Sequence, residues 1–299
     1  MWTKQDMPDQ TGKIVIITGA NSGIGFQTAL AMYEAGARVI VACRTEANAQ
    51  MAIEQIKTSS GTGALEAALI DLSSLDSVRS FATTFLVGNT KLDLLINNAG
   101  VMIPPASLTA DNFELQFGVN FLGHFALTGL LYSLLRDTPA SRVVTLTSLA
   151  YTIGSIDFDN FRLNKEYNAS REYNQSKLAN LLFTFALQQR IEAAGHGVLS
   201  LAAHPGVTRT NLARNMSADL FNHAIQTYGE LKPASQGALA SLFAAVSPDI
   251  QPGGFYGPDE DGGLRGYPAK TKIQPVGLDQ STADRLWDFA EAATKVVFP

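Results

Sequence analysis

The chain has 299 residues, of which 46% are hydrophobic and 16% are charged, and its formal net charge is −5. This composition is typical of a soluble protein with a substantial core, and the negative charge gives no electrostatic reason to expect nucleic acid or an anionic membrane as a partner. Cys43 is the only cysteine, which excludes an intramolecular disulfide. Because the sequence lacks a signal peptide and any run of roughly 18 uninterrupted apolar residues, it predicts a cytoplasmic protein without a membrane anchor.

The first predicted unit is a strand, a glycine-rich turn and a helix. Ile14–Ile17 is an apolar, β-branched run, and Phe26–Ala35 has a helical pattern. Between them lie Gly19, Gly23 and Gly25, whose missing Cβ atoms allow the backbone to approach a pyrophosphate at the start of the helix. The spacing differs from G-x-G-x-x-G but meets the same physical requirement, so we predict a dinucleotide site. The alternative interpretation is a tight turn without a ligand.

Strands and helices then alternate along the chain. The predicted strands are Ile14–Ile17, Arg38–Cys43, Leu65–Ile70, Leu92–Ile96, Arg142–Thr147, Val198–Ala203 and Gly254–Tyr256. The predicted helices are Phe26–Ala35, Glu46–Lys57, Ser74–Phe85, Asp111–Leu135, Tyr173–Ala194, Pro233–Val246 and Ser281–Val296. Regular alternation without a linker predicts one α/β domain over residues 1–299, a Rossmann-type doubly wound parallel sheet of about seven strands with helices on both faces.

Two irregular segments interrupt this alternation. We predict that residues 149–170 form an active-site loop and residues 207–231 a substrate lid, because connections this long are often binding loops. The second segment contains the apolar residues Leu212, Met216, Leu220 and Phe221. These side chains favour a hydrophobic substrate, or else they pack the lid onto the body of the protein.

A group of polar residues follows the predicted strand ends, where ligands collect in such a sheet. Ser148 follows the fifth strand, and Tyr173 and Lys177 lie four residues apart on one face of the next helix. An ammonium group close to a phenol favours the phenolate and lowers the phenol pKa from about 10. The pair could therefore protonate a carbonyl oxygen or deprotonate an alcohol, while Ser148 binds the same oxygen. Thr147 is a rival to Ser148, but alternation along the strand points the two hydroxyls in opposite directions.

The ordered set of motifs resembles the short-chain dehydrogenase/reductase family. The matching segments are TGANSGIG (Thr18–Gly25), Asp71, NNAG (Asn97–Gly100), Asn120, Ser148, YNQSK (Tyr173–Lys177) and HPG (His204–Gly206). Each motif is weak alone, but their order on the predicted elements is specific. The 25-residue spacing between Ser148 and Tyr173, ACR at Ala42–Arg44 and NFLGHF at Asn120–Phe125 resemble the retinol-dehydrogenase-like and protochlorophyllide-reductase-like branch.

The resemblance implies a role for each matching residue. Tyr173 would be the catalytic acid/base, and Lys177 would bind the nicotinamide ribose and lower the Tyr173 pKa. Ser148 would orient the substrate oxygen, and Asn120 would hold a water that links Lys177 to solvent. The residues expected to bind the cofactor are Gly19, Asn21, Ser22, Gly23, Ile24, Gly25, Arg44, Asp71, Leu72, Asn98, Ala99, Gly100, Tyr173, Lys177, Pro205, Gly206 and Thr208.

Several of these residues have structural alternatives. Asn98 could instead hydrogen-bond exposed backbone at its strand end, and Asn120 could be a satisfied polar residue inside its helix. His124 follows Asn120 by four residues, and we expect it to pack or to form a backbone hydrogen bond.

The end of the second strand predicts NADP(H) rather than NAD(H). An acidic side chain there would bind the ribose 2′-OH, whereas arginine accommodates a 2′-phosphate. The strand ends at Arg44, nineteen residues after Gly25, and Glu46 is the main argument against this assignment. Arg44 could alternatively be an exposed charge at the strand end.

The sequence therefore predicts an NADP(H)-dependent oxidoreductase that acts on a small-molecule carbonyl or alcohol, with a hydrophobic ketone or aldehyde favoured. No histidine pair has a zinc-binding spacing and no G-x-S-x-G motif is present, so neither a metal site nor a serine hydrolase is expected. The alternative is a non-catalytic NADP-binding sensor or scaffold on the same fold. The helices Asp111–Leu135 and Tyr173–Ala194 resemble those that pair subunits in this family, so a homo-oligomer is possible.

Overall fold

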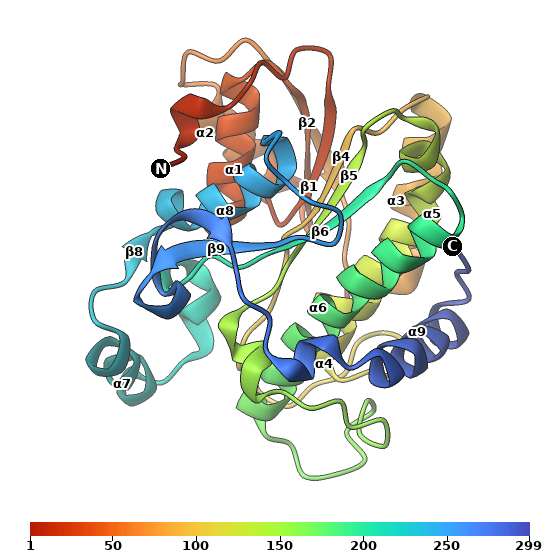
Figure 1. Cartoon of the computed structure of the whole chain (residues 1–299), viewed down its shortest axis with the longest axis vertical. Coiled ribbons are helices and arrows are strands. Elements are labelled where there is room, and N and C mark those ends of the chain that lie inside the picture. The colour runs from red at the N-terminus through yellow and green to blue at the C-terminus, as the bar shows by residue number, and fades with distance from the viewer.

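An eight-stranded sheet runs through the protein in the order β10-β9-β6-β5-β4-β1-β2-β3 (Figure 1). The structure is a computed structural model that describes residues 1–299, apart from the side chain of Leu220. The strands are β1 Ile14–Thr18, β2 Arg38–Cys43, β3 Ala64–Leu69, β4 Leu94–Asn97, β5 Arg142–Leu146, β6 Leu199–Ala203, β9 Phe255–Glu260 and β10 Arg265–Lys270. All neighbours pair in parallel except β9 and β10, which are antiparallel. The predicted doubly wound parallel sheet is confirmed.

The sheet differs from the prediction at one edge. The predicted count of about seven strands omits β10, whose sequence RGYPAK contains a glycine and a proline. Both residue types are depleted in strands, so periodicity gave no signal for this edge strand. A second, two-stranded sheet joins β7 Thr208–Arg209 to β8 Lys232–Pro233 at the two ends of the predicted lid, where the sequence indicated no clear strand.

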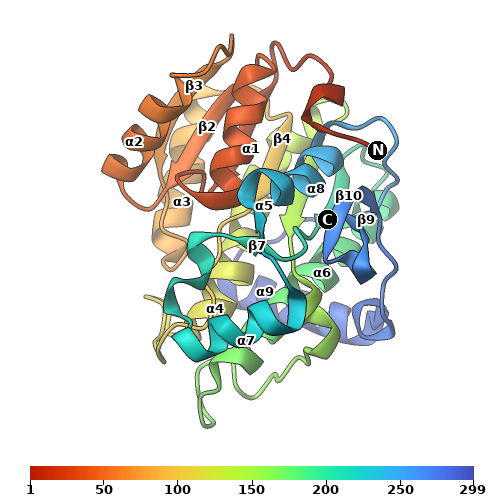
Figure 2. The same ribbon diagram turned by 90° about the vertical axis from the view of Figure 1, so that its left-hand side faces the viewer.

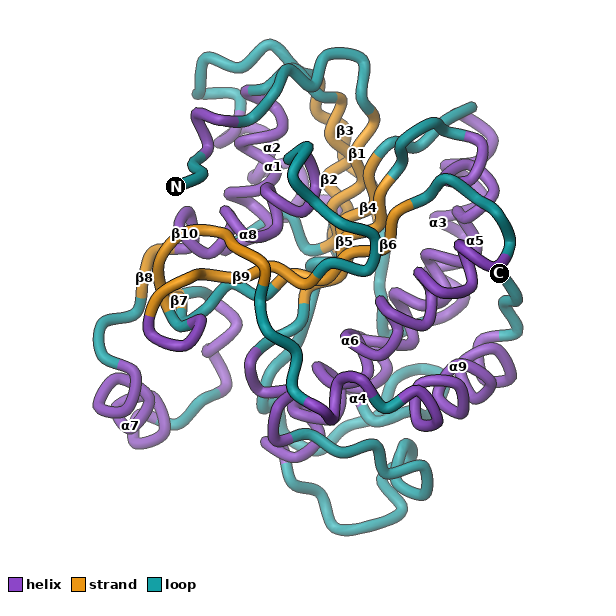
Figure 3. The backbone as a smooth tube through the Cα atoms, viewed as in Figure 1, coloured by secondary structure: helices purple, strands orange, loops and turns teal.

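Helices cover both faces of the large sheet, as the purple segments of Figure 3 show. They are α1 Gly23–Glu34, α2 Glu46–Ile56, α3 Leu75–Gly88, α4 Leu115–Phe117, α5 Gly123–Asp137, α6 Ala169–Ala193, α7 Ala218–Tyr228, α8 Ala234–Val246 and α9 Gln280–Thr294. Helices α1, α2 and α8 lie on the face turned toward the viewer in Figure 2, and α3, α5, α6 and α9 cover the opposite face.

The alternation of β1 separates two hydrophobic clusters. Ile16 belongs to the cluster that includes side chains of α3, α5, α6 and α9, while Val15 and Ile17 belong to the cluster with α1, α2 and α8. Because successive strand side chains point to opposite faces, one apolar run supplies both cores. This burial on both faces fixes β1 in the centre of the sheet and holds the glycine-rich turn that follows it.

The long predicted helix Asp111–Leu135 is interrupted. It begins as α4, continues through a π-helical turn at Gly118–Leu122 and proceeds as α5. Such π-helical turns are rare and are often found at functional sites. Asn120 lies inside this turn, so the break falls on one of the candidate site residues.

The same helical segment has an apolar composition. Leu115–Asp137 is long and apolar enough to cross a membrane by length and composition, and 78% of its most apolar window is buried inside the protein. Trp287 of α9 packs against Phe125 of α5 and Phe183 of α6, with ring centroids 5.0 and 5.9 Å away. Part of the helical surface that was expected to pair subunits is therefore covered by the chain's own C-terminal segment.

Candidate active site

A cavity of about 640 Å³ opens at the carboxyl ends of the central strands. It lies where ligands bind in doubly wound sheets, and its volume is in the ordinary range for a ligand site. Every predicted cofactor-binding residue lines it, together with Ser148. Asn120 is the one predicted site residue outside the lining, because its side chain is buried behind the cavity wall.

The glycine-rich turn has the backbone conformation that its sequence predicts. Gly19 and Gly23 have φ angles of +65° and +57°, which favour glycine. A Cβ atom on Gly25 would lie only 2.4 Å from Asn98 Nδ2 and 2.5 Å from the Gly19 carbonyl oxygen. The turn can therefore close only with glycine at this position, and the first residues of α1 line the cavity.

Asn98 fastens the turn to the next strand of the sheet. Its Nδ2 donates to the Thr18 carbonyl oxygen over 2.7 Å. The structural alternative for Asn98, a hydrogen bond to backbone at the strand end, is therefore present. Asn98 also lines the cavity, so the same residue shapes the wall on which a dinucleotide would lie.

The end of β2 presents a cation to the cavity. Arg44 is exposed and lines the cavity, and so does Asn48 in the first turns of α2. Thr45 caps α2 by accepting a hydrogen bond from the Asn48 N–H, and Glu46 lies outside the cavity lining. Arg44 thus places a positive side chain in the cavity lining at the end of β2, as the sequence predicts.

Tyr173 and Lys177 lie together in the wall of the cavity, with exposed fractions of 8% and 4%. The Lys177 Nζ lies 5.7 Å from the centre of the Tyr173 ring and donates to the Leu146 carbonyl oxygen over 3.4 Å. Ser148 lines the cavity beside this pair, and its Oγ accepts from the Ala150 N–H over 3.2 Å. Thr147 instead donates its hydroxyl to the Lys177 carbonyl oxygen over 2.6 Å, so the two hydroxyls have different roles, as strand alternation predicts.

Burial dominates the electrostatics of this pair. It raises the pKa of Tyr173 to about 12, and the neighbouring Ser148 hydroxyl lowers that pKa only in part. Burial also lowers the pKa of Lys177 to about 8. The predicted lowering of the Tyr173 pKa is therefore reversed in direction, because removing the phenol from water penalises the phenolate. A phenol that stays protonated at neutral pH is suited to donate a proton.

Asn120 connects the NNAG loop to α6. Its Oδ1 accepts from the Val101 N–H over 2.8 Å, and its Nδ2 donates to the Val101 carbonyl oxygen over 3.0 Å and to Ser176 Oγ over 2.9 Å. A Cβ atom on Gly100 would lie 3.3 Å from Asn120 Oδ1 and 3.7 Å from Lys177 Nζ. The absent side chain therefore leaves space between these two polar atoms, and Asn120 is also a satisfied helical residue.

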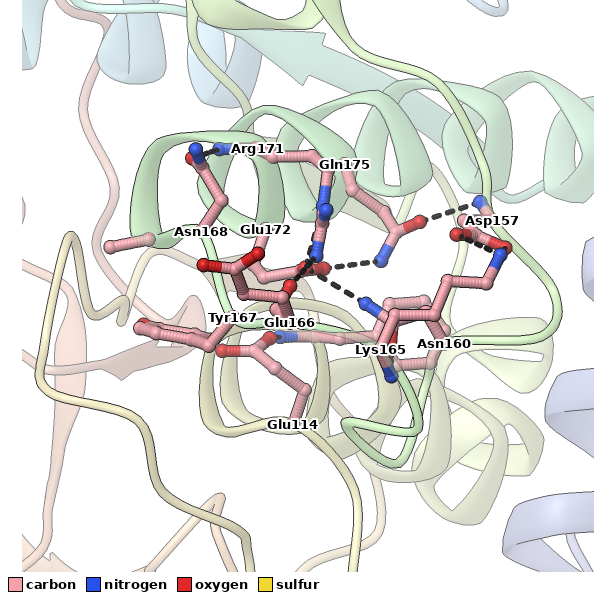
Figure 4. Close-up of polar contacts among 12 residues, drawn as sticks. Glu114, Asp157, Asn160, Lys165, Glu166, Tyr167, Asn168, Arg171, Glu172 and Gln175 are labelled. Atoms are coloured by element: carbon pink, nitrogen blue, oxygen red, sulfur yellow. Dashed lines mark hydrogen bonds and ion pairs between the residues drawn. The ribbon is translucent and has the colours of Figure 1, made fainter.

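The loop 149–170 is fixed by a polar cluster that sequence reasoning missed (Figure 4). Glu172, directly before Tyr173, is buried and accepts hydrogen bonds from Arg171, Gln175 and the loop residue Asn160. Gln175 Oε1 in turn accepts from the Asp157 N–H over 2.6 Å. Two polar residues three positions apart near the start of a helix were the available signal, but their partners are distant in sequence.

The segment 207–231 forms one wall of the cavity and carries α7, which lies at the margin of the ribbon in Figure 1. Its apolar side chains Leu212, Met216 and Phe221 line the cavity, while the side chain of Leu220 lies outside the described part of the structure. Asn215 Nδ2 donates to the Met102 carbonyl oxygen over 3.4 Å, which links this segment to the loop after β4. The segment therefore contributes a largely apolar wall to the cavity, which also includes Arg214.

Among the residues whose side chains are described, no group of three or more acidic, cysteine or histidine side chains could hold a metal ion.

Comparisons with known proteins agree with this geometry. The sequence profile described as short chain dehydrogenase matches residues 13–220. Retinol dehydrogenase 14 of Mus musculus is 40% identical, with 96% of this chain and 87% of that protein covered. Retinol dehydrogenase 11 of Homo sapiens is 42% identical, with 80% of this chain and 74% of that protein covered.

Solved structures share the fold. An uncharacterized protein from Mycobacterium Paratuberculosis has a TM-score of 0.84 at 39% identity, covering 100% of this chain and 99% of that chain. A structure described as an NAD(P) dependent gluconate 5-dehydrogenase from Beutenbergia cavernae, with bound NADP at low occupancy, has a TM-score of 0.64 at 25% identity and covers 80% of this chain and 92% of that chain. The chain thus belongs to the short-chain dehydrogenase/reductase family, in its retinol-dehydrogenase-like branch, and is an oxidoreductase with the fold that binds a nicotinamide cofactor.

Proposed function

We propose that this protein is an NADP(H)-dependent reductase of apolar aldehydes or ketones, and the matching alcohol dehydrogenase in reverse, with Tyr173 as general acid/base. The observation that carries the proposal is the buried Tyr173 phenol, which lies in the wall of the cavity with Ser148 and close to the Lys177 ammonium. A non-catalytic sensor would need a dinucleotide site but no buried proton donor.

The described residues fit a dinucleotide. The close approach of Gly25 to the Gly19 carbonyl leaves no room for a side chain, and the N-terminal residues of α1 border the cavity, as pyrophosphate binding requires. Asp71 and Leu72 would lie beside the adenine, and Pro205, Gly206 and Thr208 would border the nicotinamide. When bound, the nicotinamide would supply or accept the hydride.

Side chains of the protein would donate the proton and stabilise the charge on the substrate oxygen. In reduction, the protonated Tyr173 would donate to the carbonyl oxygen, and Ser148 would hydrogen-bond the same oxygen as negative charge develops there. Lys177 would bind the ribose and supply positive charge beside the phenol. Asn120 would hold a water in the space next to Gly100, between its Oδ1 and Lys177 Nζ, through which the proton is replaced from solvent.

The preference for NADP(H) is supported by Arg44. Its guanidinium lies at the cavity where a 2′-phosphate would extend, and Asn48 of α2 adds a neutral donor nearby. Asn21 and Ser22 in the glycine-rich turn could contribute further neutral hydrogen bonds. The bound NADP in the Beutenbergia cavernae structure is consistent with this cofactor on the same fold.

The substrate class is supported by the apolar residues of the cavity lining. Leu212, Met216 and Phe221 line the cavity together with Leu115 and Val119, so we expect an apolar substrate to be buried among them. The relatives named retinol dehydrogenase point to retinol and its aldehyde as members of this class. We propose residues 207–231 as the substrate lid and 149–170 as the active-site loop of a single domain over residues 1–299.

The test is NADPH consumption with a panel of apolar aldehydes and ketones, repeated with NADH and with Tyr173→Phe. We expect turnover that prefers NADPH and is lost in the variant. Stabilisation by NADPH without turnover on any substrate would support the sensor instead. A cytoplasmic location and the absence of a membrane anchor stay predictions from the sequence, to be checked by fractionating cells that express the protein.

A further inference from the structure

His124 lies in α5, one helical turn after Asn120, and only 1% of it is exposed. Both of its ring nitrogens have partners. Nε2 lies 2.8 Å from Thr18 Oγ1, and Nδ1 lies 2.9 Å from the Asn120 carbonyl oxygen. The ring therefore connects the end of β1, where the glycine-rich turn begins, to the π-helical turn.

The position of each proton follows from counting hydrogen bonds. Thr18 Oγ1 accepts from the N–H groups of Asn98 and Ala99, each over 3.0 Å, so its own hydrogen must be donated elsewhere. Two acceptors are in range, the Ile96 carbonyl oxygen at 3.4 Å and His124 Nε2 at 2.8 Å, and the shorter contact is the better hydrogen bond. Since Nε2 accepts, Nδ1 carries the proton of the neutral ring and donates to Asn120.

The surroundings keep the ring neutral. Burial lowers the pKa of His124 to about 4, partly opposed by the hydrogen bond with the Asn120 backbone, and the Lys177 charge lowers it further. An imidazolium would also direct a second N–H at Thr18 Oγ1, which already accepts two hydrogen bonds. The tautomer is thus set by Thr18 rather than by solvent.

The side chain of Asn120 is hydrogen-bonded to the helix that carries Tyr173. Asn120 Nδ2 donates to Ser176 Oγ, and Ser176 Oγ donates to the Tyr173 carbonyl oxygen over 2.8 Å. Hydrogen bonds therefore link Thr18 to His124 and His124 to the Asn120 backbone, and the Asn120 side chain is linked through Ser176 to the helical turn that carries Tyr173. They join the half of the cavity that would hold the dinucleotide to the half that would hold the acid.

We propose that His124 is a positioning residue for the reaction, because its Nδ1–H holds the Asn120 backbone in the π-helical turn and so aligns Tyr173 with the cofactor half of the site. The inference rests on the proposed function, since alignment matters only if proton and hydride are delivered to one substrate. Loss of the hydrogen bond should lower kcat and leave cofactor affinity unchanged, because the backbone that borders the dinucleotide keeps its other hydrogen bonds.

The test compares three substitutions of one ring. An asparagine at this position can place its Nδ2 near the site of Nδ1 and keep the donor to Asn120, whereas glutamine places its amide near the site of Nε2, and leucine replaces neither nitrogen. We expect His124→Leu and His124→Gln to lower kcat roughly three- to tenfold and His124→Asn to restore most of the loss. The Kd for NADPH, measured by fluorescence titration, should stay within about twofold in all three.

Thr128→Val is the matched control. Thr128 is a buried residue one turn further along α5. Its hydroxyl donates to the His124 carbonyl oxygen over 2.7 Å and accepts from Asn97 Nδ2 over 3.0 Å, and it forms no hydrogen bond with Asn120. This variant should lower Tm but change kcat by less than about twofold. If His124→Leu does not fold, comparison of His124→Asn with His124→Gln still tests the positioning role, because the two amides differ in which ring nitrogen they replace.

The outcomes separate the two proposals. An unchanged kcat in the Gln variant, or a kcat that follows Tm equally in the Asn and Gln variants, would overturn the positioning role while the wild-type enzyme remains active. No NADPH-dependent turnover by the wild-type protein on any carbonyl would overturn the proposed function, and the positioning role with it.

Discussion

Replacing Glu114 by glutamine is expected to stabilise the protein at about pH 8 and to leave its stability nearly unchanged at about pH 4.5. Glu114 is fully buried beside the cluster of Figure 4, where its Oε2 accepts from the Phe117 N–H over 2.7 Å. Its Oε1 has no hydrogen-bond partner within the described part of the chain. The carboxylate is therefore poorly solvated, and burial raises its pKa from 4.5 to about 7, with the neighbouring Glu172 charge adding to the increase.

The size and sign of the effect follow from this pKa. Between about pH 4.5 and pH 7 the native state binds more protons than the unfolded state, so the free energy of unfolding falls as the pH rises. Raising the pKa from 4.5 to about 7 corresponds to roughly 3 kcal/mol, which is lost in full above pH 7. Glutamine at position 114 keeps an acceptor for the Phe117 N–H and carries no charge, so the Glu114→Gln variant should recover up to about 3 kcal/mol at pH 8.

The assay is urea-induced unfolding of the wild-type protein and of Glu114→Gln at about pH 4.5 and pH 8. Glu54→Gln is the control, because Glu54 is an exposed carboxylate on α2, and its replacement should change stability by less than about 0.5 kcal/mol at either pH. A stability gain that is equal at both pH values, or a loss that grows with pH, would refute the reasoning.

Four further predictions concern the site. Tyr173→Phe should lower turnover by about 10²- to 10⁴-fold with NADPH affinity nearly unchanged, and a variant that keeps most of its kcat would remove Tyr173 from the mechanism. Because the pKa of Lys177 is lowered to about 8, its ammonium is lost as the pH rises through that value, so kcat/KM for reduction should fall there; a profile that stays flat to about pH 9 contradicts this role. Arg44→Ala should weaken NADPH binding by about 10- to 150-fold and NADH binding much less, and equal losses for both cofactors, measured by titration, would refute the 2′-phosphate assignment. Amide hydrogen exchange in residues 207–231 should slow when NADPH and substrate bind, and full protection in the free protein would argue against a lid.

The glycine-rich turn and the strand ends could be predicted because their causes are local. Gly19 and Gly23 have positive φ angles, and Gly25 approaches the Gly19 carbonyl oxygen within the same turn. The spacing of the glycines in the sequence is therefore enough to predict the turn. Tyr173 and Lys177 share a helical face through their spacing alone. The convergence of these residues on one cavity then follows from the parallel sheet, whose strand ends meet along one edge.

Other features could not be predicted because their causes are distant in sequence. The π-helical turn at Gly118–Leu122 follows a helical pattern without proline, and the hydrogen bonds of Asn120 to Val101 and Ser176 come from other elements. The direction of the shift in the Tyr173 pKa depends on burial of the phenol, which spacing along a helix does not reveal. The role of Glu172 likewise depends on loop residue Asn160, twelve positions earlier in the chain.

Neighbouring residues at the start of α6 either line the cavity or attach the helix to other parts of the protein. Tyr173 and Lys177 line the cavity, while Glu172 binds the loop 149–170 and Ser176 binds Asn120. Thr147 of the segment after β5 fixes the helix from a third side through the Lys177 carbonyl oxygen. Because a helix turns by about 100° per residue, adjacent positions point in different directions, so one turn can present the reacting groups and be held on three sides. The segment 207–231, which we propose as the substrate lid, takes no part in these three attachments. We therefore expect substitutions in this segment to alter substrate preference without moving Tyr173.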